Sequence, residues 1–166
     1  MQMNFFKWFD LPEQYTIDLN ALKKKYYALS KTTHPDNFQG QSQFERKMAE
    51  QALGYTHEAY AVLSCPVQRA IYILALNYID ISNESEQQQY LSPDFLEMAF
   101  DWQAKIQEVK QNTKNTKNKE AVMLDLENNM NSRLSQMVIF LHSQQFDLAA
   151  PLVKEIQFIQ KIREQS

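Results

Sequence analysis

An imidazole and a carboxylate flank one proline in the tripeptide His34-Pro35-Asp36, which lies in a polar stretch between two helical patterns. Proline disfavours helical backbone at the residue before it and has no N–H, so the preceding helix should end near Thr33. A His beside an Asp in such a loop is ordinarily turn chemistry, in which the carboxylate caps the next segment. A pair held out in water could instead bind another protein through one polar ring and one negative charge.

Two apolar patterns with helical spacing bracket this loop. Before it, Leu22, Tyr26 and Leu29 recur at i, i+4 and i+7. After it, over about residues 41–64, the apolar stripe consists of Phe44, Met48, Ala52, Tyr55, Ala59 and Val62. We expect two antiparallel helices that bury these stripes against each other and present the loop at one end of the hairpin.

The Lys-rich helix, the His-Pro-Asp loop and a long helix that closes in residues 59–66 resemble the J-domain of co-chaperones that act on DnaK-type ATPase chaperones. The continuation over residues 66–74 and the aromatic N-terminus over residues 4–12 narrow the resemblance to one group of J-proteins. With the overall length and the helical second half, they are similar to the HscB-type J-proteins of iron–sulfur cluster assembly. The resemblance covers essentially the whole chain and is more specific in residues 4–76.

This resemblance implies that the chain carries a site that binds a DnaK-type, HscA-like chaperone. It gives His34, Pro35 and Asp36 the docking contact, and it gives the basic helix face the role of steering an acidic chaperone. That face consists of Lys23, Lys24 and Lys25. The alternative for each lysine is an ordinary solvated surface charge.

The second half of the chain predicts an antiparallel three-helix bundle. Ser92-Pro93-Asp94 reads as a helix start, with a cap, a proline at the first position and an acid that suits the helix dipole. Apolar seams follow over residues 95–109, 122–141 and 152–159, with a loop at residues 112–119. We expect Pro151 in the first turn of the last helix, where its missing N–H costs least.

Three large apolar residues fall outside those seams: Leu96, Phe100 and Phe158. Such residues can line a partner site, or they can simply widen the core. The resemblance implies the first reading, in which they bind the iron–sulfur scaffold protein (IscU-like). The order of Glu97 and Met98 is swapped relative to the common family pattern, and Gln103 and Ala104 replace charged residues, so the polar rim departs from the family.

Composition favours an all-α protein, because the 166 residues include only two glycines and no long alternation of apolar and polar residues. The expected parts are a J-domain (1–78) with a long antiparallel hairpin and short helices, a linker (79–91) and the bundle (92–166). The net charge of −3 argues against nucleic acid as the main partner. No apolar run approaches a membrane span, although a membrane-surface anchor is the alternative to a packed helix for residues 1–12.

Cys65 is the single cysteine, which excludes an internal disulfide, and no leader pattern is evident, so we expect a cytoplasmic protein. No P-loop, metal-ligand spacing or catalytic constellation is found; the expectation is no cofactor, no metal and no enzyme activity. The predicted function is a co-chaperone that brings the scaffold to its chaperone and stimulates the chaperone's ATPase. The alternatives are a J-protein for another client, a helical nucleic-acid binder that uses Lys23–Lys25, and a hydrolase that uses His34 and Asp36.

Overall fold

The computed structural model describes residues 4–82, 89–111 and 116–165. Helices are the only extended regular elements within those ranges, so the expected all-α class is confirmed. The contacts divide the chain into two units, Met1–Ile73 and Leu74–Ser166. The predicted boundaries at residues 78 and 92 stay a prediction, and residues 83–88 of the expected linker lie outside the described residues.

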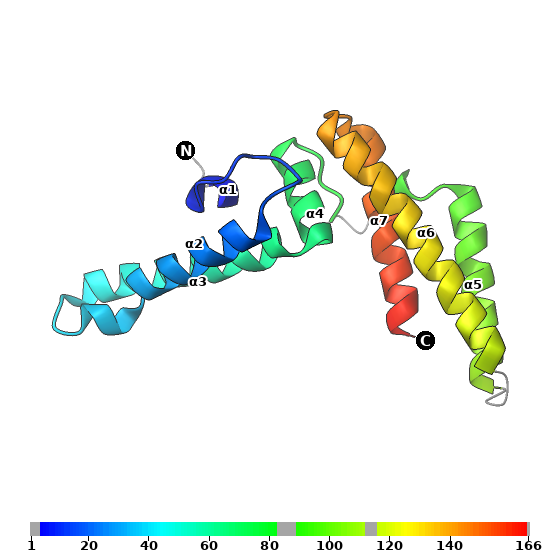
Figure 1. Cartoon of the computed structure of the whole chain (residues 1–166), viewed down its shortest axis with the longest axis horizontal. Helices are drawn as coiled ribbons and strands as arrows, with labels where there is room; N and C mark the ends of the chain where they lie inside the picture. The colour runs from blue at the N-terminus through cyan, green and yellow to red at the C-terminus, as the bar shows by residue number, and fades with distance from the viewer. Residues whose placement is uncertain (1–3, 83–88, 112–115, 166) are drawn as a thin grey trace. The chain divides into compact units, whose positions relative to one another are not determined.

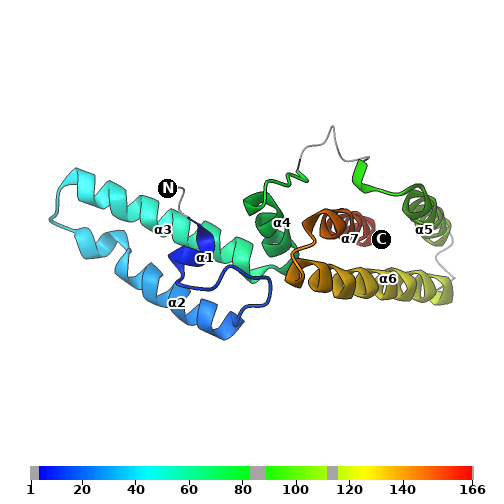
Figure 2. The ribbon, with the colours of Figure 1, turned by 90° about the horizontal axis from the view of Figure 1, so that it is seen from above.

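The first unit is built around a hairpin of α2 (Leu19–Thr32) and α3 (Gln43–Ser64), which run side by side in opposite directions (Figures 1 and 2). The short α1 (Phe5–Trp8) packs on α3, and η1 (Pro35–Phe38) forms the connection. Asp18 caps α2 by accepting hydrogen bonds from the amides of Asn20 and Ala21. The expected hairpin is therefore present, and Asp18 caps its first helix.

The ring contacts between α2 and α3 involve residues of α3 that lie outside the predicted stripe. The ring of Tyr26 stacks on that of Tyr60 with centroids 4.1 Å apart, and its hydroxyl lies 3.0 Å from Nδ1 of His57. The contact fixes His57 as a structural histidine of the hairpin.

The predicted stripe of α3 instead lies under α1 over part of its length. The ring of Tyr55 contacts those of Phe5 and Trp8, each at 5.1 Å between centroids. Because α1 is only four residues long, it does not extend along the stripe to the start of α3. Phe44 and Met48 are therefore 72% and 50% exposed, and the expectation that they are buried against α2 is wrong.

The corner between α3 and α4 (Pro66–Leu76) is held by the buried Arg69. Its Nη1 donates to the carbonyl oxygen of Leu63 at 2.6 Å, and its guanidinium lies over the ring of Tyr15, 4.9 Å from the centroid. Burial raises the pKa of Tyr15, and the positive charge of Arg69 opposes that rise. One cation thus satisfies the end of α3 and packs the loop before α2.

The second unit contains α5 (Pro93–Gln111), α6 (Thr116–His142) and α7 (Phe146–Glu164), arranged as the predicted antiparallel bundle (Figure 1). The hydroxyl of Ser92 accepts a hydrogen bond from the amide of Phe95, as expected of an N-cap. The bundle core includes the following buried side chains from all three helices: Phe95, Ala99, Trp102, Ile106, Val122, Leu126, Ile159 and Ile162.

Two expectations about this unit are wrong. Residues 116–119 were expected in a loop, but they form the start of α6; residues 112–115 lie outside the described residues. Pro151 lies inside α7, beyond its first turn, because the helix already begins at Phe146. The proline leaves the carbonyl of Asp147 without an amide donor, and that residue is exposed, so water can replace the bond.

Among the described residues, no single helix meets the length and apolarity needed to cross a membrane. Only α3 and α4 taken together do so, and they are bent by 105° at their break.

Candidate functional site

The His-Pro-Asp loop is a short turn tied to the helix before it. The amide and hydroxyl of Thr33 both donate to the carbonyl of Leu29, which ends α2, and Pro35 opens η1. The side-chain amide of Asn37 then donates to the carbonyl of Lys31 at 2.6 Å. The predicted end of the helix near Thr33 is confirmed, and the loop returns to it through a specific bond.

His34 and Asp36 point into solvent and lie beside each other. Their side chains are 53% and 72% exposed, and Nδ1 of the imidazole is 3.4 Å from a carboxylate oxygen. The same Nδ1 accepts a hydrogen bond from the backbone amide of Asp36 at 3.3 Å. Acceptance at Nδ1 leaves the proton of the neutral ring on Nε2, which makes Nε2 the donor available to a partner.

The loop is also fixed where it enters α3. Gly40 has a φ of +94°, a conformation that side-chain-bearing residues rarely adopt. Ser42 and Glu45 then form a reciprocal capping box at the start of α3. The hydrogen bonds from Ser42 lower the pKa of Glu45 below its usual value. Both ends of the turn are thus held by local hydrogen bonds.

The three candidate lysines fall into two groups. Lys23 and Lys24 are exposed on α2, as a steering surface requires. Lys25 instead donates from Nζ to the backbone oxygen of Asp10 at 2.6 Å and to its carboxylate at 3.1 Å. Asp10, which has a φ of +48°, was not selected from the sequence, because a pair 15 residues apart has no local signal. Lys25 therefore has a structural partner within the chain.

The candidate client residues differ in exposure. Phe100 is 67% exposed on α5, whereas Leu96, one turn earlier, is half-buried. Phe158 of α7 packs on the bundle core, with its ring 5.8 Å from that of Phe95 in an edge-to-face arrangement. The alternative reading, in which these residues widen the core, therefore applies in part to Phe158.

A surface hollow of about 660 Å³ adjoins Phe100 between α5 and α7. Its lining includes the buried Ile162 of α7 and the uncharged Gln103 and Ala104 of α5. Glu97 and Met98 of the swapped pair are exposed on α5. The hollow therefore combines apolar side chains with uncharged polar groups and one cation, Lys110 of α5.

No group of three or more His, Cys, Asp or Glu side chains suited to a metal ion occurs in the part of the chain that the structure describes.

A helical hairpin that presents an exposed His-Pro-Asp turn is the arrangement expected of a J-domain co-chaperone. No protein-family model matches the chain. It is 31% identical to the co-chaperone protein HscB of Proteus mirabilis, over 98% of this chain and 93% of that protein. It is 30% identical to an HscB homologue of Paraburkholderia phymatum, over 95% of this chain and 88% of that protein.

Solved structures agree with this class. The chaperone HscB from Vibrio cholerae matches with a TM-score of 0.85 and 28% identity, over 98% of this chain and 94% of that one. Human co-chaperone HscB matches with a TM-score of 0.88 at 20% identity, over 99% and 80%, which shows the shared fold. The chain belongs to the HscB family of J-domain co-chaperones of iron–sulfur cluster assembly.

Proposed function

We propose that this chain docks its His34-Pro35-Asp36 loop on a DnaK-type, HscA-like chaperone, stimulates that chaperone's ATPase, and delivers to it an IscU-like iron–sulfur scaffold. The observation that carries the proposal is the exposure of the His34 and Asp36 side chains on a turn anchored at both ends. A rigid turn loses little conformational freedom when it is bound, so it is well suited to act as a contact.

In this mechanism the Asp36 carboxylate pairs with an arginine near the domain junction of the chaperone, and Nε2–H of His34 adds a polar contact. Among the polar contacts that the side chains of His34 and Asp36 can make with a protein partner, a carboxylate–guanidinium pair is the strongest. Docking biases the chaperone toward its hydrolysis-competent state, because the chain binds that state more tightly than the other. Lys23 and Lys24 supply the long-range attraction to an acidic chaperone surface.

The scaffold binds the face formed by Leu96, Phe100 and Phe158, with Phe100 as the exposed anchor. Two features together support this assignment: the apolar area of Phe100, and the hollow beside it, which could receive an apolar side chain of a partner. Because Gln103 and Ala104 at the hollow are uncharged, a different client remains the second candidate. Capture assays with the full chain and the scaffold, with Phe100→Ser as the negative control, separate the two candidates.

The deciding experiment measures steady-state ATPase of the chaperone with the wild-type chain, His34→Gln or Asp36→Asn. Both variants should lose most of the stimulation and keep wild-type helical content, because neither side chain is buried. Normal stimulation by both variants would contradict the docking role of the loop. A chain that turns over an ester or nucleotide without any chaperone would instead support the hydrolase alternative.

A further inference from the structure

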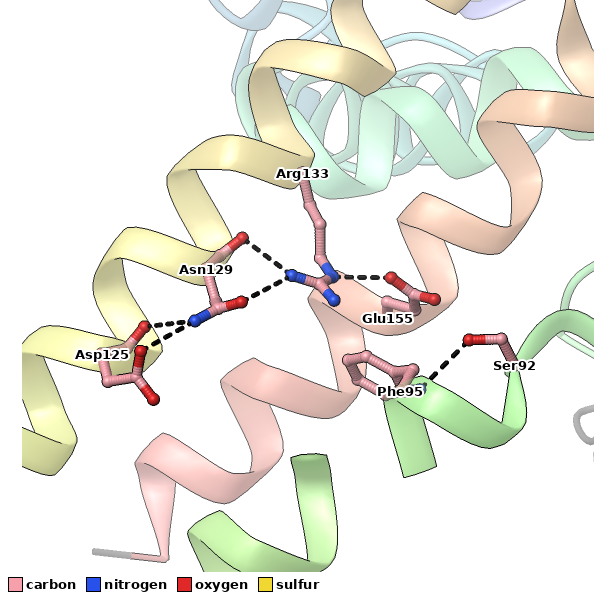
Figure 3. A network of polar contacts seen from close by, with 6 residues as sticks. All are labelled: Ser92, Phe95, Asp125, Asn129, Arg133 and Glu155. Atoms are coloured by element: carbon pink, nitrogen blue, oxygen red, sulfur yellow. Dashed lines mark hydrogen bonds and ion pairs between the residues drawn. The ribbon is translucent and has the colours of Figure 1, made fainter. Parts of the chain in front are cut away.

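A buried ion pair joins α6 to α7 in the bundle (Figure 3). Nε of Arg133 lies 2.6 Å from a carboxylate oxygen of Glu155, and the two side chains are only 13% and 11% exposed. Removing two charges from water is costly, and apolar residues of similar volume are often at least as stable in such places. Stability alone is therefore a weak explanation for this pair.

The guanidinium of Arg133 also contacts one residue of its own helix, α6, and one residue of α5. Nη1 donates to the side-chain oxygen of Asn129, one turn earlier on α6, at 3.0 Å. The guanidinium lies over the ring of Phe95 on α5, 5.0 Å from its centroid. One planar group thus touches all three helices of the bundle. Arginine can do this because it has five fixed donors and a flat face, whereas lysine has neither.

The network continues from Arg133 back to α5 at a second point. The side-chain amide of Asn129 donates to the carboxylate of Asp125 at 3.0 Å, as Figure 3 shows. The other carboxylate oxygen of Asp125 accepts from the indole N–H of Trp102 at 2.7 Å. Phe95 and Trp102 are seven residues apart, about two turns, so they lie on the same face of α5. Contacts at these two residues fix the rotation of α5 about its own axis.

That rotation decides where the side chains of the proposed scaffold-binding face point. Leu96 and Phe100 lie between Phe95 and Trp102 on α5, on a different side of the helix. Phe158 meets the ring of Phe95 directly. A change in the orientation of Phe95 would therefore change the positions of all three side chains.

We infer that Arg133, through Glu155, Asn129 and Phe95, is a positioning residue for the scaffold-binding face. This inference rests on the proposed function of Leu96, Phe100 and Phe158. The buried pair keeps α5 at one rotational setting, so that the exposed Phe100 ring and the Phe158 edge face the same partner.

The test replaces both charges together, because a single replacement would leave one charge buried and could unfold the bundle. The variant is Arg133→Met with Glu155→Met in the full chain. We expect wild-type helical content, a thermal midpoint close to that of the wild type and unchanged stimulation of chaperone ATPase by the chain alone. The dissociation constant for the cluster-free scaffold protein should rise at least about fivefold.

Arg133→Lys provides the conservative comparison, because it keeps the charge opposite Glu155 but not the flat contact with Phe95; it should be intermediate. The matched control places methionines at the exposed Gln136 and Lys161 of the same two helices and should bind as the wild type does. Wild-type affinity in the buried double variant overturns the inference. The inference is also overturned if the smaller fraction of folded protein accounts for the whole loss of affinity.

A second measurement does not need the scaffold. In the buried double variant, the nuclear Overhauser contacts between the Phe95 and Phe158 rings should weaken, and amides of α5 should exchange faster than those of α6 and α7. Unchanged ring contacts and exchange rates overturn the positioning role. Failure of the wild-type chain to bind the scaffold would instead contradict the proposed function, and these spectra would still decide the role of Arg133.

Discussion

At the scale of single residues, Lys24 and Lys25 show how adjacent identical side chains acquire different roles. Lys24 is exposed, whereas Lys25 donates two hydrogen bonds to Asp10. An exposed ion pair of this kind contributes about 0–1 kcal/mol, so its main effect is to hold the loop after α1 against α2. Only the free charges on this helix are available to attract a partner over distance.

The change Lys24→Glu tests that distinction. At low salt it should raise the concentration of chain that gives half-maximal ATPase stimulation by about three- to tenfold, since charge reversal opposes electrostatic steering. The effect should shrink as ionic strength rises and the Debye length shortens. Lys161→Glu, an exposed charge on α7, is the control. Equal behaviour of the two variants would show that the α2 face does not meet the chaperone.

At the scale of helices, Gly54 is a residue of low helix propensity in α3 that could be replaced. It lies in the middle of the helix, is exposed, and a Cβ built there meets nothing within 4 Å. Gly54→Ala should therefore raise the free energy of unfolding by about 0.5–1 kcal/mol through the better helix propensity of alanine. Urea denaturation followed by circular dichroism measures it. A lower midpoint would mean that the bend or dynamics of α3 require glycine there.

The capping box of α3 predicts a pH dependence. The Ser42 hydrogen bonds lower the pKa of Glu45 in the folded chain below its usual 4.5. Because the folded-state pKa is depressed, the stabilisation is present above pH 4.5 and is lost as the pH falls through the lowered value. Ser42→Ala should remove this component, so the stability difference between it and the wild type should narrow on acidification. A difference that is constant from pH 7 to pH 3 would contradict this account.

The elements that follow local rules could be predicted from the sequence, and those that depend on distant partners could not. The caps at Asp18 and Ser92 and the stop before Pro35 depend on residues one to three positions away. The stripe containing Phe44 has the correct period, but a period does not say which helix covers it. The start of α7 lacked a signal, because Gln145 at its N-cap is not one of the residue types that usually cap helices.

The same limit applies to the candidate site. The exposed pair His34 and Asp36 was predictable, because a proline between two helices leaves its neighbours in a loop. The pairs Lys25–Asp10 and Arg133–Glu155 join residues 15 and 22 positions apart, and their partners depend on how the helices pack. Sequence spacing alone therefore missed the residues that hold the candidate surfaces in place.

At the scale of the whole molecule, the two candidate surfaces belong to different units of the chain. The His-Pro-Asp loop lies in Met1–Ile73, and Phe100 lies in Leu74–Ser166. Each unit has its own buried side chains, such as Leu22 and Leu63 in the first and Leu126 and Ile159 in the second. A substitution on the surface of one unit should therefore leave the folding of the other unchanged.

This division predicts that the two binding activities are separable. Phe100→Ser should lower scaffold affinity at least tenfold, as expected for a central apolar anchor, while the chain alone still stimulates the chaperone. Asp36→Asn should show the reverse pattern. Calorimetric titration with each partner in turn gives both affinities. A loss of both activities in either variant, with helical content intact, would mean that the units act through each other.

The bonds that return the His-Pro-Asp turn to α2 and close it onto α3 also bear on the kinetics of encounter. Asn37 holds the turn to Lys31, and the Ser42–Glu45 box holds the start of α3. A surface that already has its bound shape need not search for it after collision. Association at this turn is then governed by diffusion and charge, and differences in lifetime among its complexes arise from how fast they separate.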